Sequence, residues 1–172
     1  MKWIIFTGTW RLTNKEVEND VREAARRVFE NGDGLVTGGA TGVDYFAMDE
    51  FLKLDPTCTH MRIFIPARLS HFISDYHKNW KQHPIDATDI DDLAHMLTII
   101  KERNPSALFE VRKEEGDITQ AEYDIRHNEE VTFSDEVHAF QVNNSAGTSD
   151  TINKARAAGL PITLHKTYTI PE

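Results

Sequence analysis

Residues 34–44 read Gly-Leu-Val-Thr-Gly-Gly-Ala-Thr-Gly-Val-Asp, a short apolar run followed by a glycine-rich turn. The run 34–37 is typical of a short buried strand, and the glycines after it allow the chain to turn tightly. Thr41 and Asp44 have the spacing of a helix capping box, after which apolar residues recur at helical spacing as far as Leu54. The stretch therefore predicts a strand, a glycine turn and a helix in immediate succession.

The segments on either side repeat this order. Residues 3–7 form an apolar run that ends at Gly8, and Thr13 with Glu16 has the capping-box spacing before a second helical pattern. Residues 62–66 form a third apolar run. An alternation of strands and helices requires crossover connections, so it predicts a parallel sheet.

The second half of the chain is harder to interpret. Residues 68–116 are polar with one clear helical stripe at 90–100, so we predict a variable, mainly helical segment there. The elements predicted after it are a helix at about 118–131, a strand at 137–142, a helix at 149–158 and a strand at 161–164. The whole pattern predicts one α/β domain over residues 1–172. We expect a Rossmann-like three-layer sandwich with a mainly parallel five-stranded sheet, numbered along the chain in the order 3-2-1-4-5.

Composition narrows the classes of function. The chain has 28 acidic against 19 basic residues and a net charge of −9, which disfavours nonspecific binding to nucleic acid. The single cysteine, Cys58, and the absence of a leader-like pattern among the first residues predict a reducing, cytoplasmic setting. Its apolar runs are far shorter than the roughly 20 residues of a membrane-spanning helix, so we expect no membrane segment.

Three glycine-containing loops are the candidates for ligand binding. Residues 8–11, 38–42 and 145–148 each follow a predicted strand, so all three project from the carboxyl edge of the sheet, where ligands of such folds bind. Glycine lets the backbone approach a ligand closely, and the helix that follows presents unpaired N–H groups to an anion. We therefore predict a site for a small phosphate-bearing ligand without a metal ion. For each loop taken alone, an ordinary turn is the alternative interpretation.

The candidate ligand-binding residues of these loops are glycines, hydroxyl side chains and one arginine: Gly8, Thr9, Arg11, Gly38, Gly39, Thr41, Gly42, Ser145, Gly147 and Thr148. Asp44 is a candidate as well, although helix capping alone would explain it. A metal site at His71 and His77 is disfavoured because their spacing does not suit one helix face. The acidic run at 89–92 is interpreted as a solvated helix N-terminus, and His138 as a core histidine.

Residues 36–44 and 147–159 together resemble the SLOG superfamily, and its small uncharacterised members match best. That superfamily includes the Rossmann domain of DNA-processing protein A and the Lonely Guy phosphoribohydrolases. The resemblance implies a Rossmann-like fold, a nucleotide-related ligand at the glycine loops and, often, a homodimer. Arg126-His127-Asn128 is similar to the family's arginine-containing helix segment, which implies that Arg126 and Asn128 belong to the ligand site.

The chain departs from the Lonely Guy signature Pro-Gly-Gly-x-Gly-Thr-x-x-Glu, because Thr151 stands in place of its glutamate and cannot act as an acid or base. The leading hypothesis is therefore a binding or sensing protein whose only expected cofactor-like group is a bound nucleotide or nucleotide derivative. One alternative is a hydrolase or transferase of N-glycosidic bonds that uses Asp44, Asp150 or a carboxylate from residues 110–130. A second alternative, single-strand DNA binding, follows from the resemblance alone.

Overall fold

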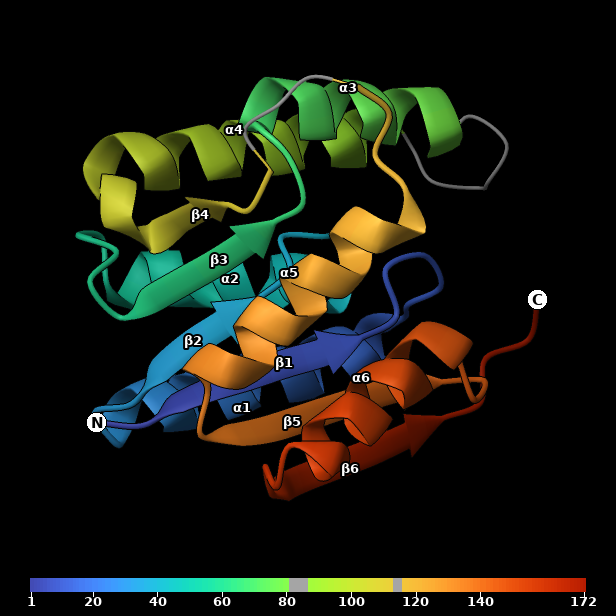
Figure 1. The fold of residues 1–172 in the computed structure, drawn as a ribbon. Coiled ribbons are helices and arrows are strands. Elements are labelled where there is room, and N and C mark those ends of the chain that lie inside the picture. The colour runs from blue at the N-terminus through green and yellow to red at the C-terminus, as the bar shows by residue number, and fades with distance from the viewer. Residues whose placement is uncertain (81–86, 113–115) are drawn as a thin grey trace.

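The computed structural model describes residues 1–80, 87–112 and 116–172 and has an α/β architecture (Figure 1). Its elements, in chain order, are β1 (Trp3–Gly8), α1 (Lys15–Glu30), β2 (Gly34–Thr37), α2 (Val43–Leu54), β3 (Met61–Ile65), α3 (Leu69–Trp80), α4 (Ala87–Arg103), a short 3₁₀ turn (Pro105–Ala107), β4 (Leu108–Glu110), α5 (Gln120–Phe133), β5 (Glu136–Val142), α6 (Ala146–Ala157) and β6 (Ile162–Tyr168). None of the described helices is long and apolar enough to cross a membrane.

The six strands form one sheet in the order β4-β3-β2-β1-β5-β6, and every neighbouring pair is parallel. The predicted Rossmann-like parallel α/β fold is confirmed. The predicted count of five strands is wrong, because residues 108–110 add an edge strand beside β3 and the sheet has six strands. That strand has three residues, too few to show a periodic pattern in the sequence. The five strands that were predicted keep the relative order β3-β2-β1-β5-β6. The order reverses between β1 and β5, so ligands are expected at the carboxyl ends of these two strands.

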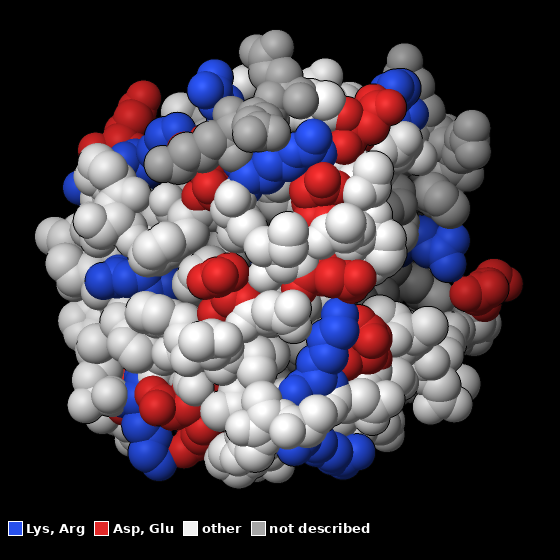
Figure 2. Space-filling view, in the orientation of Figure 1, with Lys and Arg blue, Asp and Glu red and all other residues white. Residues whose placement is uncertain are grey.

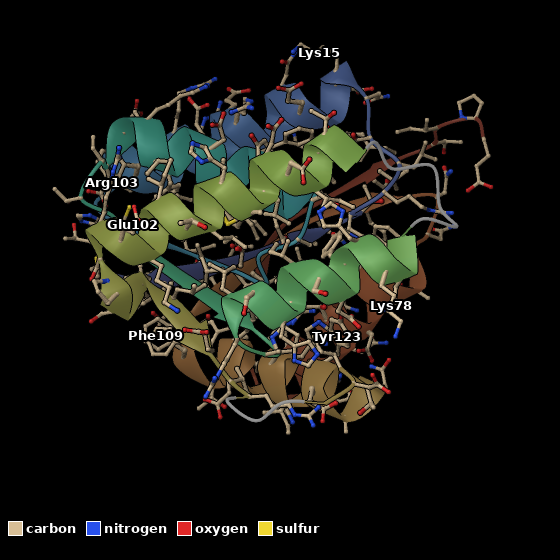
Figure 3. All side chains as sticks on the ribbon, turned by 90° about the horizontal axis from the view of Figure 1, so that it is seen from above. Lys15, Lys78, Glu102, Arg103, Phe109 and Tyr123 are labelled. Carbon is tan, nitrogen blue, oxygen red and sulfur yellow. The ribbon has the colours of Figure 1, made fainter. Side chains whose placement is uncertain are left out.

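Helices cover both faces of the sheet. Ile5 and Val36 lie in the apolar core on the side of α5 and α6, whereas Phe6 and Leu35 lie in the core on the side of α1 and α2. Figure 3 shows α1 and α2 on one side of the sheet and α5 and α6 on the other, with α3 and α4 nearest the viewer. Because both faces are covered, the loops at the carboxyl edge are left to form a site.

Two helix starts differ from the prediction. The N-cap of α1 is Asn14, whose side chain accepts a hydrogen bond from the Val17 amide at 3.0 Å, so the box predicted at Thr13 is wrong by one residue. Gly42 is the N-cap of α2 and offers no side-chain cap. The box predicted there does not form, because the Thr41 hydroxyl donates to the Trp10 carbonyl instead. Competing tertiary hydrogen bonds of this kind are invisible to a local pattern.

The ends of the later elements also differ from the prediction. Helix α6 begins at Ala146, three residues earlier than predicted, and β6 continues to Tyr168 rather than ending at 164. Helix α5 spans Gln120–Phe133, two residues later than predicted at each end. Such shifts are usual for helix ends. The earlier start of α6 matters most, because it places Gly147 and Thr148 inside the first turn of the helix rather than in the loop before it.

Candidate functional site

The loops after β1 and β2 touch through their backbones at the carboxyl edge of the sheet (Figure 1). Gly42 has a φ of 75°, and a β-carbon there would lie 2.3 Å from the Thr9 carbonyl oxygen. The Val43 amide donates to that same oxygen at 3.0 Å. Gly42 is therefore required both by its left-handed conformation and by the close approach of the first loop.

The first loop is organised by its own hydroxyl. Thr9 is buried, and its Oγ1 accepts hydrogen bonds from the amides of Arg11 at 3.4 Å and Leu12 at 3.3 Å. The Arg11 side chain is 38% exposed and lies 4.0 Å from a carboxylate oxygen of Glu172. Its guanidinium also lies 5.9 Å from the centre of the Trp10 ring, and an exposed arginine with such long contacts can turn to a ligand at little cost.

A pocket of about 280 Å³ lies where the first loop, the start of α2 and the start of α4 meet. It is lined by aromatic, basic and acidic side chains together with the turn itself: Trp10, Arg11, Thr13, Thr41, Gly42, Tyr45, Phe46, Asp89 and Asp92. This volume is close to the lower end of typical small-molecule sites. Three predicted site residues, Arg11, Thr41 and Gly42, therefore come together here.

The sequence did not reveal the aromatic part of this pocket. Tyr45 and Phe46 lie on α2 among residues at core-like spacing, and Trp10 follows the first glycine without a motif of its own. Asp89 and Asp92 line the pocket at the start of α4, although they were interpreted as a solvated helix end. No signal in the sequence places the start of α4 beside the first loop, because that contact depends on tertiary packing.

The amides of the second loop are engaged within the protein. The Gly39 amide donates to Thr37 Oγ1 at 3.2 Å, the Ala40 amide to Asp44 Oδ2 at 3.2 Å, and the Thr41 amide to Tyr76 Oη at 3.0 Å. Burial raises the pKa of Tyr76 to about 12, so its hydroxyl keeps its proton. These three donors would have to exchange partners before they could bind an external anion.

A buried charge cluster lies on the α5 side of the same loop. Arg126 Nη1 donates to the Gly38 carbonyl at 3.0 Å, and Arg126 Nε lies 3.5 Å from Glu130 Oε1. A β-carbon on Gly38 would lie 2.8 Å from Arg126 Nη1 and 3.0 Å from Glu130 Oε1. Gly38 thus leaves the space that Arg126 and Glu130 occupy. We call Asp44, Arg126 and Glu130 the α5 charge cluster.

The two carboxyls of this cluster compete for one guanidinium. Burial raises the pKa of Asp44 to about 6, while hydrogen bonds from backbone amides and the charge of Arg126 oppose that rise. Burial also raises the pKa of Glu130 to about 8, and again Arg126 opposes the rise. Burial in a low dielectric disfavours the charged form of a carboxyl, and a nearby like charge adds to the effect. Glu130 therefore holds a proton near neutral pH.

Tyr123 and Asn128 differ in how they relate to this cluster. The Arg126 guanidinium lies 5.0 Å from the centre of the Tyr123 ring, and Figure 3 shows Tyr123 beside α3. Asn128, a predicted site residue, is exposed on α5. Arg126 thus contacts the second loop through the Gly38 carbonyl, and its role in a ligand site, which the resemblance implied, stays a prediction.

The third loop is separate from the pocket. Ser145 Oγ donates to Thr148 Oγ1 at 2.8 Å, and Gln141 Nε2 donates to the Ser145 carbonyl at 3.1 Å. Thr148 is buried and Gly147 is exposed, with open space around it. Residues 145–148 do not line the pocket at the first loop. Gly8, a further predicted site residue, packs against the Phe140 carbonyl and Val43, where a side chain would not fit.

Asp124, His127 and Asp150 form a group with metal-ligating atoms within 4.8 Å of one another. Lys154 Nζ already lies 3.1 Å from the Asp124 carboxylate and 2.9 Å from that of Asp150. Its ammonium supplies the positive charge that a cation would bring. Burial lowers the pKa of His127 to about 4, so the ring is neutral. Of the histidine pair considered in the sequence, His77 contacts Asp91 of α4 at 3.1 Å.

Charges of both signs are mixed on the face formed by α5 and α6. Figure 2 shows acidic and basic side chains interspersed there rather than a continuous basic area. Backbone contacts to a nucleic acid usually need such a basic area. The visible face therefore lacks the electrostatic pattern typical of a DNA-binding surface.

No protein-family model and no curated protein sequence matches the chain. Among solved structures, DNA processing protein A from Helicobacter pylori, described for its single-stranded DNA binding mode, matches with a TM-score of 0.67 and 18% identity. The match covers 99% of this chain and 66% of that protein, so the chain spans just under two thirds of its length. TM1055, a structural genomics target, matches with a TM-score of 0.56 and 15% identity over 94% of this chain and 72% of that one. The chain thus shares a Rossmann-like α/β fold with these two proteins.

Proposed function

We propose, from this fold and the resemblance of the sequence to the SLOG superfamily, that the protein is a cytoplasmic binding or sensing protein for a nucleotide or a nucleotide-derived phosphate ligand. One observation supports the proposal above all. The pocket at the first loop combines three aromatic rings, an exposed arginine and the start of a helix within about 280 Å³. Fold likeness alone would not separate this function from others.

Each part of the pocket suits one part of a nucleotide. The rings of Trp10, Tyr45 and Phe46 can stack on a base. The N-terminus of α2 and the Arg11 guanidinium favour a phosphate, because both present positive charge and N–H donors. Carboxylates such as Asp92 can accept hydrogen bonds from sugar hydroxyls. In this arrangement the phosphate binds at α2 rather than at the amides of residues 39–41, which have internal acceptors.

Thermal unfolding in the presence of nucleosides, mononucleotides, cyclic nucleotides and ADP-ribose tests the proposal. We expect at least one phosphate-bearing compound to raise the melting temperature, and Arg11→Ala to abolish that rise. Arg27→Ala is the matched control, because Arg27 is an exposed arginine that pairs with Glu23 on α1 and does not line the pocket. If no nucleotide stabilises the protein, or if Arg27→Ala weakens binding as much as Arg11→Ala does, the proposal is wrong.

The α5 charge cluster favours a second candidate, cleavage of an N-glycosidic bond. Glu130 belongs to the range 110–130 in which a catalytic carboxylate was expected, and it lies beside Arg126 and interacts with the charge of Asp44. A protonated carboxyl next to an ionised one is the pairing that general acid and base catalysis requires. Release of free base from nucleosides or nucleotides, lost in Asp44→Asn and Glu130→Gln, would support it. If no compound on the panel releases free base, this candidate is wrong and the proposal of a binding function stands without it.

Single-strand DNA binding is a third candidate and rests only on fold likeness. For this chain, a net charge of −9 and the mixed charges in Figure 2 disfavour binding to a polyanion such as DNA. Binding to an oligonucleotide at low salt that weakens steeply with added salt would favour this candidate over the nucleotide proposal. The expected homodimer is a separate proposal, which light scattering of the purified protein tests directly.

A further inference from the structure

The second glycine loop holds a carboxylate of its own chain. Asp44 Oδ2 accepts a hydrogen bond from the Ala40 amide at 3.2 Å, and the Gly38 amide also stabilises the ionised carboxylate, because its hydrogen bond lowers the pKa of Asp44. Backbone amides at the start of a helix are the donors that bind phosphate or sulfate in other proteins. The Asp44 carboxylate thus occupies a place suited to an oxyanion.

Arg126 completes the surroundings of that carboxylate. Its charge lowers the pKa of Asp44, and its Nη1 donates to the Gly38 carbonyl at 3.0 Å. The same guanidinium contacts Glu130 at 3.5 Å. While Asp44 is ionised, its charge and that of Arg126 balance. An additional anion would introduce an unpaired negative charge in a buried place, which is costly.

An independent observation marks the same place as incompletely paired. Arg126 Nε and Glu130 Oε1 are buried and, apart from their 3.5 Å ion pair with each other, have no hydrogen-bond partner among the described residues. The two residues are only 9% and 4% exposed. Buried polar atoms without partners are rare and cost free energy, so they indicate a site at which a ligand or a rearranged side chain can be accommodated.

We propose that the turn at Gly38–Ala40 and Arg126 form an oxyanion site which Asp44 fills in the resting protein. A sulfate-like or phosphate-like anion enters this site only in exchange for the Asp44 carboxylate. The proposal rests on contacts within the second loop and α5, so it does not depend on nucleotide binding in the pocket at the first loop.

Protonation of Asp44 controls the exchange. The ionisable groups around it are Arg126 and Glu130 from α5 and Tyr76 from α3, with Lys154 of α6 acting on Glu130. Tyr76 stays protonated and Lys154 stays charged throughout the neutral range, since the pKa of each is raised. The pKa of Glu130 is about 8 and that of Asp44 about 6, so on acidification below neutrality Asp44 is the carboxylate that gains a proton. Anion binding therefore strengthens as the pH falls through about 6.

Sulfate is the probe, because its charge is constant over this range. Melting temperatures are measured in sodium sulfate and in sodium chloride of equal ionic strength for the wild type, Asp44→Ala and the control Glu129→Ala, which removes an exposed carboxylate from α5. Near neutral pH we expect sulfate to stabilise Asp44→Ala saturably, by about 2–3 kcal/mol at a hundredfold excess over its dissociation constant. The wild type and Glu129→Ala should show only the non-saturating stabilisation that sulfate gives to proteins in general.

The wild type provides a second readout that needs no variant. Below about pH 6, where Asp44 is protonated, sulfate should stabilise the wild type saturably, which it does not do at neutral pH. If sulfate has no saturable effect on Asp44→Ala or on the acidified wild type, the proposal is wrong. The double variant Asp44→Ala with Arg11→Ala separates the two sites. A sulfate effect that persists in it supports the second loop, whereas an effect lost in it assigns sulfate to the pocket and also overturns the proposal.

Discussion

The two sides of the second glycine loop differ in how their charges are paired. On one side, Arg11 lines a pocket and is 38% exposed, with a 4.0 Å ion pair to Glu172 and a 5.9 Å contact with the Trp10 ring. On the other side, Arg126 is buried and shared between Asp44 and Glu130. Both arginines were expected to meet a ligand. The comparison teaches that an arginine near a glycine loop can serve either an external anion or an internal one, and that burial distinguishes the two.

The largest expected effect comes from removing the buried arginine. Arg126→Ala leaves the ionised Asp44 carboxylate without its buried countercharge, and loss of one partner of a buried ion pair costs about 3–5 kcal/mol. Urea denaturation monitored by circular dichroism measures the change in the free energy of unfolding. Arg27→Ala should change it by less than about 0.5 kcal/mol, because Arg27 is exposed. Equal effects of the two substitutions would show that the cluster is not a buried ion pair.

The next effect concerns the backbone contact that joins the two loops. Gly42→Ala places a β-carbon at a φ of 75° and within 2.3 Å of the Thr9 carbonyl, so we expect a loss of about 1–3 kcal/mol from backbone strain, with the clash adding to it. Gly147→Ala is the control, because a β-carbon there meets nothing within 4 Å. A Gly42→Ala variant as stable as the wild type would mean that the two loops can move apart.

A third effect appears as a dependence on pH. The folded-state pKa of Glu130 is raised from 4.5 to about 8, so the folded protein binds a proton more tightly than the unfolded chain does. This contribution to stability is fully present below about pH 4.5 and is lost as the pH rises through about 8. Glu130→Gln should flatten the decline in unfolding free energy across that interval. A decline that is unchanged in Glu130→Gln would assign it to another group.

The smallest expected effect on stability comes from Arg11, on the side of the second loop where the pocket lies. Arg11→Ala should change the free energy of unfolding by less than about 0.5 kcal/mol, since its ion pair with Glu172 is long and exposed. The same denaturation experiment that tests Arg126→Ala measures it. A loss of several kcal/mol would mean that Arg11 has a structural role, and it would remove the contrast between the two arginines.

The sequence predicted the architecture better than the site. Alternation of strands and helices was enough for the parallel sheet, because crossover connections follow from it. It could not predict β4, which has three residues of which only Leu108 is buried. Capping boxes were misassigned at Thr13 and Thr41, where Asn14 and a contact to Trp10 provide the observed hydrogen bonds.

The sequence located some residues of the candidate site and missed others, for physical reasons. Glycines could be located from the sequence, because a turn after a strand demands them, and Gly38 and Gly42 indeed lie at close contacts. Glu130 was included only in a broad range, since nothing in a hydropathy pattern marks a buried glutamate on a helix of irregular spacing. Whether the thirteen candidates bind a ligand stays a prediction, which the nucleotide and sulfate experiments address.

The contact between Gly42 and Thr9 limits how the pocket can adapt. Gly42 lines the pocket, and its main chain is held against the Thr9 carbonyl, so no change of side-chain rotamer can move this part of the lining. Adjustment is left to the lining side chains, such as Tyr45 and the acidic residues at the start of α4. A pocket that is rigid in one place and adjustable in others tolerates variation in a ligand only where the ligand meets the side chains.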